Sequence, residues 1–92
     1  MLYAIICRDK PGALDTRKAN REAHLAHIHA SKGAIVQAGP FLDSGGQMCG
    51  SLLIFEGEDQ AEAEAWAADD PYAKAGLFES VEIRPWNRVL GG

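Results

Sequence analysis

Apolar residues gather in four short segments of the chain, and each segment is bounded by glycine, proline or polar residues. We predict strands at these segments, which are residues 2–8, 34–42, 50–56 and 78–84. In the first and third, both alternating sets of side chains are apolar, which is typical of strands covered on both faces of a sheet. In the last, Val81 and Ile83 alternate with charged residues, as on a half-exposed edge strand.

Two helices are predicted between these strands. The first spans about residues 15–32, with Asp15 as its N-cap and Gly33 in the left-handed position beyond its end. The second begins after Asp59, which has a glutamate three residues later, and continues through an alanine-rich run. A short extra turn follows, with Asp70 as its N-cap and a proline at its first position.

The element order βαββαβ predicts an α+β fold, a ferredoxin-like split βαβ sandwich with two helices on one face of a four-stranded antiparallel sheet. The chain of 92 residues contains no linker, so we expect a single domain over residues 1–92. The first and third strands should lie in the middle of the sheet. Because the helices can cover only one face, we expect a second copy to cover the other, which gives a homodimer.

Composition limits the classes of partner and location. Nine Lys and Arg residues against 13 Asp and Glu residues give a net charge of −4, and no basic run is present, so nucleic acid is not an expected partner. No segment approaches the ~20 apolar residues that span a bilayer, and the amino terminus lacks a signal-peptide pattern. We expect a soluble cytoplasmic protein, with Cys7 and Cys49 as reduced thiols in or near the core.

Three histidines, His24, His27 and His29, lie in the first predicted helix. On a helical wheel only His24 flanks the apolar stripe and can face the space between helix and sheet, whereas the other two are expected on the solvent side. A histidine in this position can equally be a core residue with one hydrogen-bond partner. His24 and His27 have a spacing that could chelate a metal, but no third ligand is indicated, so no metal is expected.

Topology gives His24 a partner. The predicted helices run antiparallel, which places Asp70 beside the first half of the helix that carries His24. A histidine that titrates near neutral pH and is oriented by a carboxylate can transfer protons. Asp70 can also be a helix cap alone. The same end of the sheet receives the ends of the first two strands, with Arg8, Asp9, Gly39 and Pro40, and the start of the third, with Gly50 and Ser51. Of these, Arg8, Gly39, Pro40 and Ser51 are predicted to bind the substrate.

Several motifs, in this order and spacing, resemble the YCII-related family of small YciI-like domains over essentially the whole chain. They are LYAIICRDKPGAL at the start, R-x-x-H-L at residues 21–25, A-G-P at 38–40, G-S at 50–51, D-P-Y at 70–72 with A-G-L-F-E after it, and V-E-I-R-P-W near the end.

The resemblance implies a ferredoxin-like fold that dimerises through its sheets as a dimeric α+β barrel. It also implies an active site built from the histidine of R-x-x-H-L and the aspartate of D-P-Y, which are His24 and Asp70 here. A few relatives in the family eliminate hydrogen chloride from chlorinated, hydroxylated aromatics or related lactones without a cofactor. The segment DSGGQMCG is shorter here than in some relatives, so the resemblance does not specify the substrate.

Two hypotheses follow. In the first, the protein is a cofactor-independent lyase or isomerase of a small molecule, in which His24 moves a proton and Asp70 orients it. Arg8 or Arg21 would bind an anionic group, Tyr72 would line the pocket, and no serine, cysteine or lysine is in a nucleophile setting. In the second, the same cleft belongs to a non-catalytic binding or interaction module.

Overall fold

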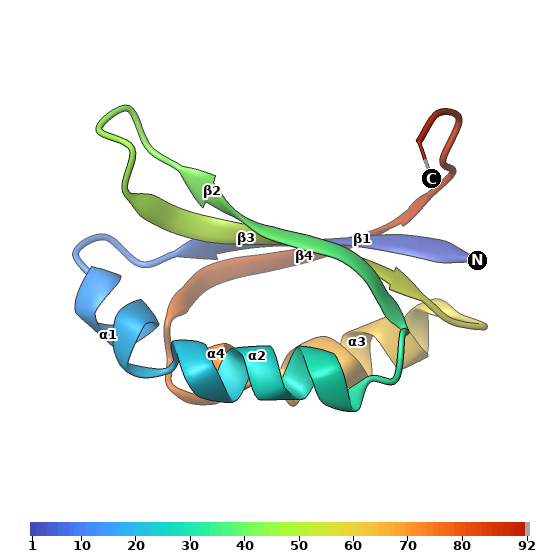
Figure 1. Ribbon diagram of the computed structural model, residues 1–92, viewed down its shortest axis with the longest axis horizontal. Coiled ribbons are helices and arrows are strands. Elements are labelled where there is room, and N and C mark those ends of the chain that lie inside the picture. Colours follow the sequence, from blue (N-terminus) through green and yellow to red (C-terminus); the bar gives the residue numbers. More distant parts are fainter. Residues whose placement is uncertain (92) are drawn as a thin grey trace.

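The computed structural model describes residues 1–91 and has an α+β sandwich architecture, in which all helices lie on one face of a single sheet (Figure 1). Its elements are β1 (Leu2–Asp9), α1 (Leu14–Ala19), α2 (Arg21–Ala30), β2 (Ile35–Leu42), β3 (Met48–Glu56), α3 (Gln60–Ala68), α4 (Pro71–Lys74) and β4 (Phe78–Trp86). The sheet is antiparallel with the order β2-β3-β1-β4. The predicted ferredoxin-like fold is confirmed, with β1 and β3 as the central strands.

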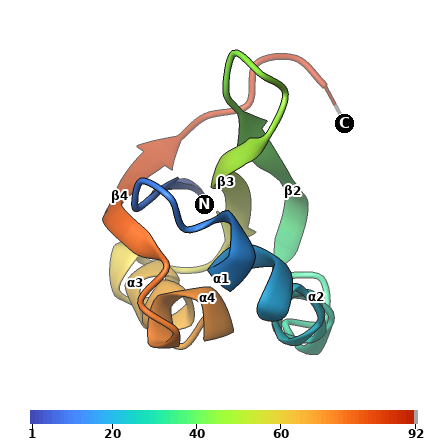
Figure 2. The same cartoon turned by 90° about the vertical axis from the view of Figure 1, so that its left-hand side faces the viewer.

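The core lies between the inner face of the sheet and the helices (Figure 2). Side chains at alternate positions of β1 and β3 point toward the helices, because successive residues of a strand face opposite sides. Small alanines on α3 let this helix approach the sheet closely. The buried members of this cluster are Tyr3, Ile5, Cys7, Leu53, Phe55, Ala63 and Ala67.

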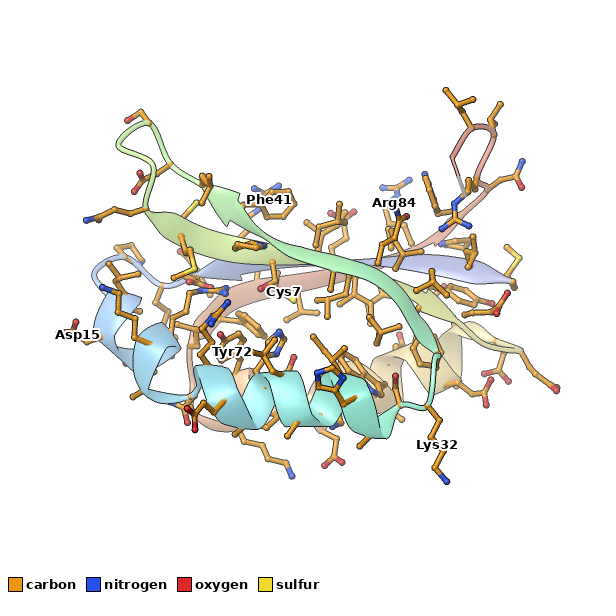
Figure 3. All side chains as sticks on the ribbon, viewed as in Figure 1. Cys7, Asp15, Lys32, Phe41, Tyr72 and Arg84 are labelled. Atoms are coloured by element: carbon orange, nitrogen blue, oxygen red, sulfur yellow. The ribbon has the colours of Figure 1, made fainter. Side chains whose placement is uncertain are left out.

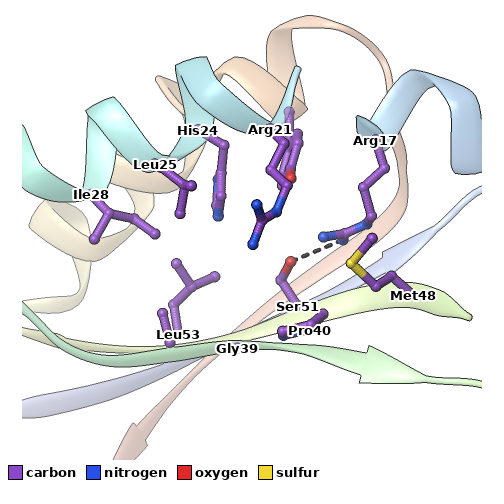
Figure 4. A pocket seen from close by; sticks show the side chains of 12 residues that line it. Arg17, Arg21, His24, Leu25, Ile28, Gly39, Pro40, Met48, Ser51 and Leu53 are labelled. Atoms are coloured by element: carbon purple, nitrogen blue, oxygen red, sulfur yellow. Dashed lines mark hydrogen bonds between the residues drawn. The ribbon is translucent and has the colours of Figure 1, made fainter. Parts of the chain in front are cut away.

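The first predicted helix is divided into two, so the prediction of one continuous helix was wrong. Asn20 leaves the helical conformation, with φ −111° and ψ 7°, and its side-chain amide donates to the carbonyl of Thr16 at 2.9 Å. Asparagine interrupts helices because its side chain competes for backbone hydrogen bonds. The break turns the short α1 toward one end of the sheet, which brings Arg17 over the core (Figure 4).

The predicted caps had different outcomes. Asp15 is not an N-cap: α1 begins at Leu14, and Asp15 points into solvent (Figure 3). The caps of the later helices are confirmed, because Asp59 accepts from the amide of Glu62 at 3.0 Å and Asp70 accepts from that of Tyr72 at 2.9 Å. Gly33 has the predicted left-handed φ, 91°.

The outer face of the sheet carries no helix (Figure 1). Leu52 and Trp86 are each 37% exposed there, and a hollow of about 620 Å³ lies over β2, β3 and Trp86. Cys49 is exposed, so its predicted place in or near the core was wrong. Within residues 1–91, no helix is long and apolar enough to cross a membrane.

Candidate active site

A histidine and an aspartate from different helical segments meet beneath α2. The Nδ1 atom of His24 lies 2.9 Å from Oδ1 and 3.0 Å from Oδ2 of Asp70, and both side chains are buried. An ionised carboxylate only accepts hydrogen bonds, so Nδ1 carries the proton and Nε2 of the neutral ring keeps its lone pair. The His24 ring points into a cavity between α2 and the sheet (Figure 4).

The Asp-Pro sequence at the start of α4 holds the aspartate in place. Asp70 is the N-cap, Pro71 occupies the first turn, and Oδ1 of Asp70 accepts from the backbone amide of Tyr72 as well as from His24. The carboxylate is therefore both a helix cap and the partner of an imidazole. The interpretation of Asp70 as a cap alone leaves this second contact without an explanation.

Tyr72 forms the floor beside the histidine. Its ring stacks on His24 with 4.0 Å between ring centroids and 15° between planes, and the Cζ atom of Arg17 lies 4.7 Å from its ring centroid. Burial raises the pKa of the Tyr72 hydroxyl, although the charges of Arg17 and Arg21 partly oppose this shift. The hydroxyl is therefore protonated at neutral pH.

Arg17 is the centre of a second polar group in the site. Its Nε and Nη2 atoms donate to the two carboxylate oxygens of Asp9 at 2.7 and 2.9 Å, and Nη2 also donates to Oγ of Ser51 at 2.9 Å. Burial works against its charge, but the hydrogen bonds and charge of Asp9 more than offset this, so the pKa of Arg17 is raised. The result is a fixed, buried cation beside the cavity.

Close packing of the two central strands positions Ser51. A side chain at Gly50 would collide with the backbone carbonyl of Cys7 on β1, so glycine permits the two strands to approach at this point. The next residue, Ser51, pairs with Cys7 in the sheet and faces the helices, where Arg17 binds it.

The cavity has a volume of about 150 Å³ and opens between α2 and the edge strand β2 (Figure 4). One end is polar, and the other is lined by aliphatic side chains. The lining residues are Arg17, Arg21, His24, Leu25, Ile28, Ala38, Gly39, Pro40, Met48, Ser51, Leu53 and Tyr72.

The structure brings most of the site residues predicted from sequence to this cavity. His24, Arg21, Gly39, Pro40, Ser51 and Tyr72 line it, and Asp70 lies behind the imidazole. Arg8 does not belong to this set. It lies between the buried Cys7 and the inward-facing Asp9, so strand alternation directs its side chain to the exposed outer face.

Arg17 is the main site residue that sequence reasoning missed. The expectation of one helix from residue 15 to 32 placed Arg17 on the same uninterrupted cylinder as His24. The helix break at Asn20 removes this constraint. Two features of the sequence could have indicated the position of Arg17. Asn20 is a residue that often interrupts helices, and Asp9, two residues after Cys7, lies on the same face of β1 and can bind a cation there.

The other histidines have separate surroundings. His29 is exposed as predicted, but His27 is half-buried: its ring stacks on Trp66 at 4.3 Å between centroids, and Nε2–H donates to the Trp66 carbonyl at 3.0 Å. The prediction of a solvent-side His27 was wrong because α3 packs against this turn of α2. Among residues 1–91, no three His, Cys, Asp or Glu side chains are grouped to hold a metal ion.

Cys7 lies beneath the polar end of the site, pointing into the space between sheet and helices (Figure 3). Burial, with a further contribution from the negative charge of Asp70, raises the pKa of the Cys7 thiol to about 12. A neutral thiol is a poor nucleophile, so the proton-transfer candidate in this site is the imidazole.

Comparison with known proteins identifies close relatives. The model of the YCII-related domain matches residues 1–87. Protein YciI of Escherichia coli O6:H1 is 38% identical over an alignment of 98 residues, which covers 98% of this chain and 100% of that protein. A Haemophilus influenzae protein is 35% identical over the same shares of the two chains.

A solved structure is equally similar in sequence. It is 5-chloro-2-hydroxyhydroquinone dehydrochlorinase (TftG) from Burkholderia phenoliruptrix AC1100, in complex with 2,5-dihydroxybenzoquinone. This protein is 38% identical to the chain with a TM-score of 0.89, and the match covers 95% of this chain and 94% of that one.

Proposed function

The chain belongs to the YCII-related family, and from this premise we propose that it is a cofactor-independent lyase or isomerase that transfers a proton with the His24–Asp70 pair. The observation that carries the proposal is the contact of 2.9 Å between Nδ1 of His24 and Oδ1 of Asp70 beside an open cavity. The contact leaves Nε2 available as a base toward a substrate.

The carboxylate has a defined task in this mechanism. When Nε2 accepts a proton, the ring becomes a cation, and the negative charge of Asp70 stabilises that cation. Because Asp70 is 1% exposed, water screens this interaction little. Stacking on Tyr72 holds the imidazole in one plane, so its Nε2 atom keeps a fixed direction.

The opposite wall supports the charge that develops on the substrate. Removal of a proton from a hydroxylated ring leaves an oxyanion or enolate. Asp9 fixes Arg17 at one end of the cavity, and Arg17 in turn donates to Oγ of Ser51, whose own proton can be donated to a substrate. Such donors stabilise a negative oxygen without reorganising, which lowers the barrier to proton removal.

The size of the cavity limits the substrate. An engineered protein cavity of about 150 Å³ holds benzene, and the cavity here is of the same size, about 150 Å³. Leu25, Ile28 and Leu53 provide an apolar end for a ring or short hydrocarbon part. We therefore propose a single-ring or similarly small substrate with at least one acidic hydroxyl.

Elimination of hydrogen chloride is one reaction of this type. A proton would first move from a ring hydroxyl to the carbon that carries chlorine, which gives a keto tautomer. His24 would then remove a proton from a second hydroxyl, the electron pair would move through the ring to form a second carbonyl, and chloride would leave from the protonated carbon. One proton and one chloride are lost, and no oxidant or cofactor is needed. The dehydrochlorinase with TM-score 0.89 supports the proposal that this chain acts on a related compound.

Chloride release from 5-chloro-2-hydroxyhydroquinone, compared between the wild type and His24→Asn, tests the proposal directly. We expect turnover by the wild type and its loss in the variant. As a second assay, solvent deuterium exchange into small hydroxylated aromatics detects proton transfer without elimination. Absence of both activities across such a panel would contradict the proposal.

The alternative function is a non-catalytic module that binds a small molecule in the same cavity. A binding module needs the cavity but not a free base. Small phenols and acids would then bind with equal affinity to the wild type and to His24→Asn, without exchange or elimination. The position of His24 in the cavity lining, with Nδ1 bound by a buried carboxylate and no hydrogen bond on Nε2 among residues 1–91, favours the enzyme.

We further propose that a second copy covers the outer face of the sheet in a homodimer. Leu52 and Trp86 are each 37% exposed beside the hollow there, and burial of such apolar area would stabilise association. Size-exclusion chromatography with light scattering should give twice the chain mass, and Leu52→Asp should give the monomer. We propose a cytoplasmic location, consistent with two free cysteines.

A further inference from the structure

One cation lining the cavity has no hydrogen-bond or ion-pair partner among residues 1–91. Arg21 is the first residue of α2, one helical turn before His24, and its guanidinium reaches into the cavity between His24 and Ser51 (Figure 4). The residue is exposed, and none of the ion pairs among residues 1–91 involves it. Arg21 therefore differs from Arg17, which lines the same cavity but is buried and bound on two nitrogens by Asp9.

The positive charge of Arg21 acts inside the site. It lowers the pKa of the buried Tyr72 hydroxyl, in opposition to the effect of burial, so its field reaches the floor of the cavity. The charge of Arg17 is balanced by Asp9, and the charge of Asp70 faces the imidazole of His24. Within residues 1–91, Arg21 is the charged group of the cavity lining that no side-chain ion pair neutralises, so an anion entering the cavity would meet it.

We propose that Arg21 makes the cavity select rings that carry a negative charge, as a carboxylate or an ionised hydroxyl, over neutral rings of the same size. The inference rests on the proposed substrate cavity and names the substrate class more narrowly. The ring occupies the apolar end beside Leu25 and Ile28, and the anionic group lies toward the mouth against Arg21. Guanidinium donors match the two oxygens of a carboxylate.

The two arginines are expected to have different roles because one is held by an ion pair and the other is not. Arg17 is fixed before any ligand arrives, so it suits the charge that develops during the reaction. Arg21 is free to move onto a charge that the ligand already carries, so it contributes to binding. Removal of Arg21 should therefore raise KM for an anionic substrate more than it lowers kcat.

Benzoate and benzamide are a matched pair of probes, because they have the same ring and nearly the same shape but differ in charge. Their dissociation constants should be measured by titration calorimetry at pH 8 and low salt for the wild type, Arg21→Gln and Arg21→Lys. Lys18→Gln is the control, since it removes one exposed positive charge from neighbouring α1 outside the cavity lining.

The wild type should bind benzoate about tenfold more tightly than benzamide, as expected for a hydrogen bond to a charged group. Arg21→Gln should abolish this preference by weakening benzoate binding alone, Arg21→Lys should keep part of it, and Lys18→Gln should keep it all. A preference that is unchanged in Arg21→Gln, or equal binding of the two probes by the wild type, would overturn the inference.

The same titrations in a His24→Asn background separate this inference from the proposed function. The preference for benzoate should persist there, because it comes from Arg21 and not from the imidazole. If the wild type binds neither probe, the inference is overturned, while the tests of proton transfer by chloride release and deuterium exchange stand separately. If the preference holds and both turnover assays fail, the cavity selects anions but the proposed proton transfer is wrong.

Discussion

His24 and His27 lie one turn apart on α2, and each stacks on an aromatic ring from the following helical segments, yet their surroundings differ. His24 contacts the carboxylate of Asp70 through Nδ1 and presents Nε2 to a cavity. His27 uses Nε2 itself to bind the Trp66 carbonyl. A neutral carbonyl fixes a ring without stabilising its cation as a carboxylate does. The comparison shows that a charged partner and a free second nitrogen, rather than stacking or helix position, distinguish a candidate base.

Substitution of the two histidines tests this comparison with the largest expected effect. His24→Asn should lower turnover by about 10³-fold, within the range of general acid–base catalysis. His27→Asn should change turnover less than about threefold and should instead lower the unfolding temperature, since it removes a contact between α2 and α3. Steady-state kinetics and thermal unfolding of both variants provide the measurement. Equal losses of activity would show that both residues act only through the fold.

Asp70→Asn isolates the charge of the histidine's partner. Asparagine caps helices about as well as aspartate, so the cap on Tyr72 should persist while the negative charge disappears. Turnover should fall by about 10²-fold, because the imidazolium loses its stabilising carboxylate and Nδ1 its fixed tautomer. Asp59→Asn, at the N-cap of α3, is the matched control and should leave turnover unchanged. Normal activity of Asp70→Asn would leave Asp70 as a structural cap.

The fold and half of the site could be predicted from the sequence because they depend on local patterns. Apolar residues on both faces of β1 and β3 agreed with their central place in the expected topology, and D-P-Y placed a capping carboxylate opposite the helix that carries His24. The Arg17–Asp9 pair was missed, because it depends on a helix break at Asn20 whose signal in the sequence is a single asparagine. His27 was misplaced because the helical wheel of α2 does not contain the position of Trp66 on α3.

Ser51→Ala tests the polar side of the cavity that His24 also lines. The Ser51 hydroxyl accepts a hydrogen bond from Arg17 and can donate its own proton to a negative oxygen of the substrate. Its removal therefore takes away one donor to the substrate and leaves one N–H group of Arg17 without this acceptor. We expect a decrease of about tenfold in kcat with little change in KM, because the interaction strengthens as negative charge develops. Kinetics on a verified substrate provide the measurement. A rise in KM alone would assign Ser51 to ground-state binding.

The smallest expected effect is a difference in chemical reactivity between the two cysteines. It tests whether the interior beside Asp70, the partner of His24, is closed to solvent. Burial, together with the negative charge of Asp70, raises the pKa of the Cys7 thiol to about 12, whereas Cys49 is exposed. Iodoacetamide at pH 8 should therefore modify Cys49 readily and Cys7 only as fast as the chain unfolds, as peptide mass spectrometry would show. Rapid modification of Cys7 in the folded protein would contradict a dry, negatively charged environment behind the imidazole.

The raised pKa of the Cys7 thiol also predicts the direction in which the free energy of unfolding changes with pH. An unfolded cysteine loses its proton near pH 8.5, whereas the folded Cys7 keeps it to about pH 12. The stabilisation from the neutral buried thiol is therefore present below pH 8.5 and declines as the pH rises toward 12, because the unfolded chain ionises first. Cys7→Ala should make the loss of stability between pH 9 and 11 shallower than in a Cys49→Ser control. Identical slopes in urea unfolding would mean that the Cys7 thiol ionises as easily in the folded chain as in the unfolded one.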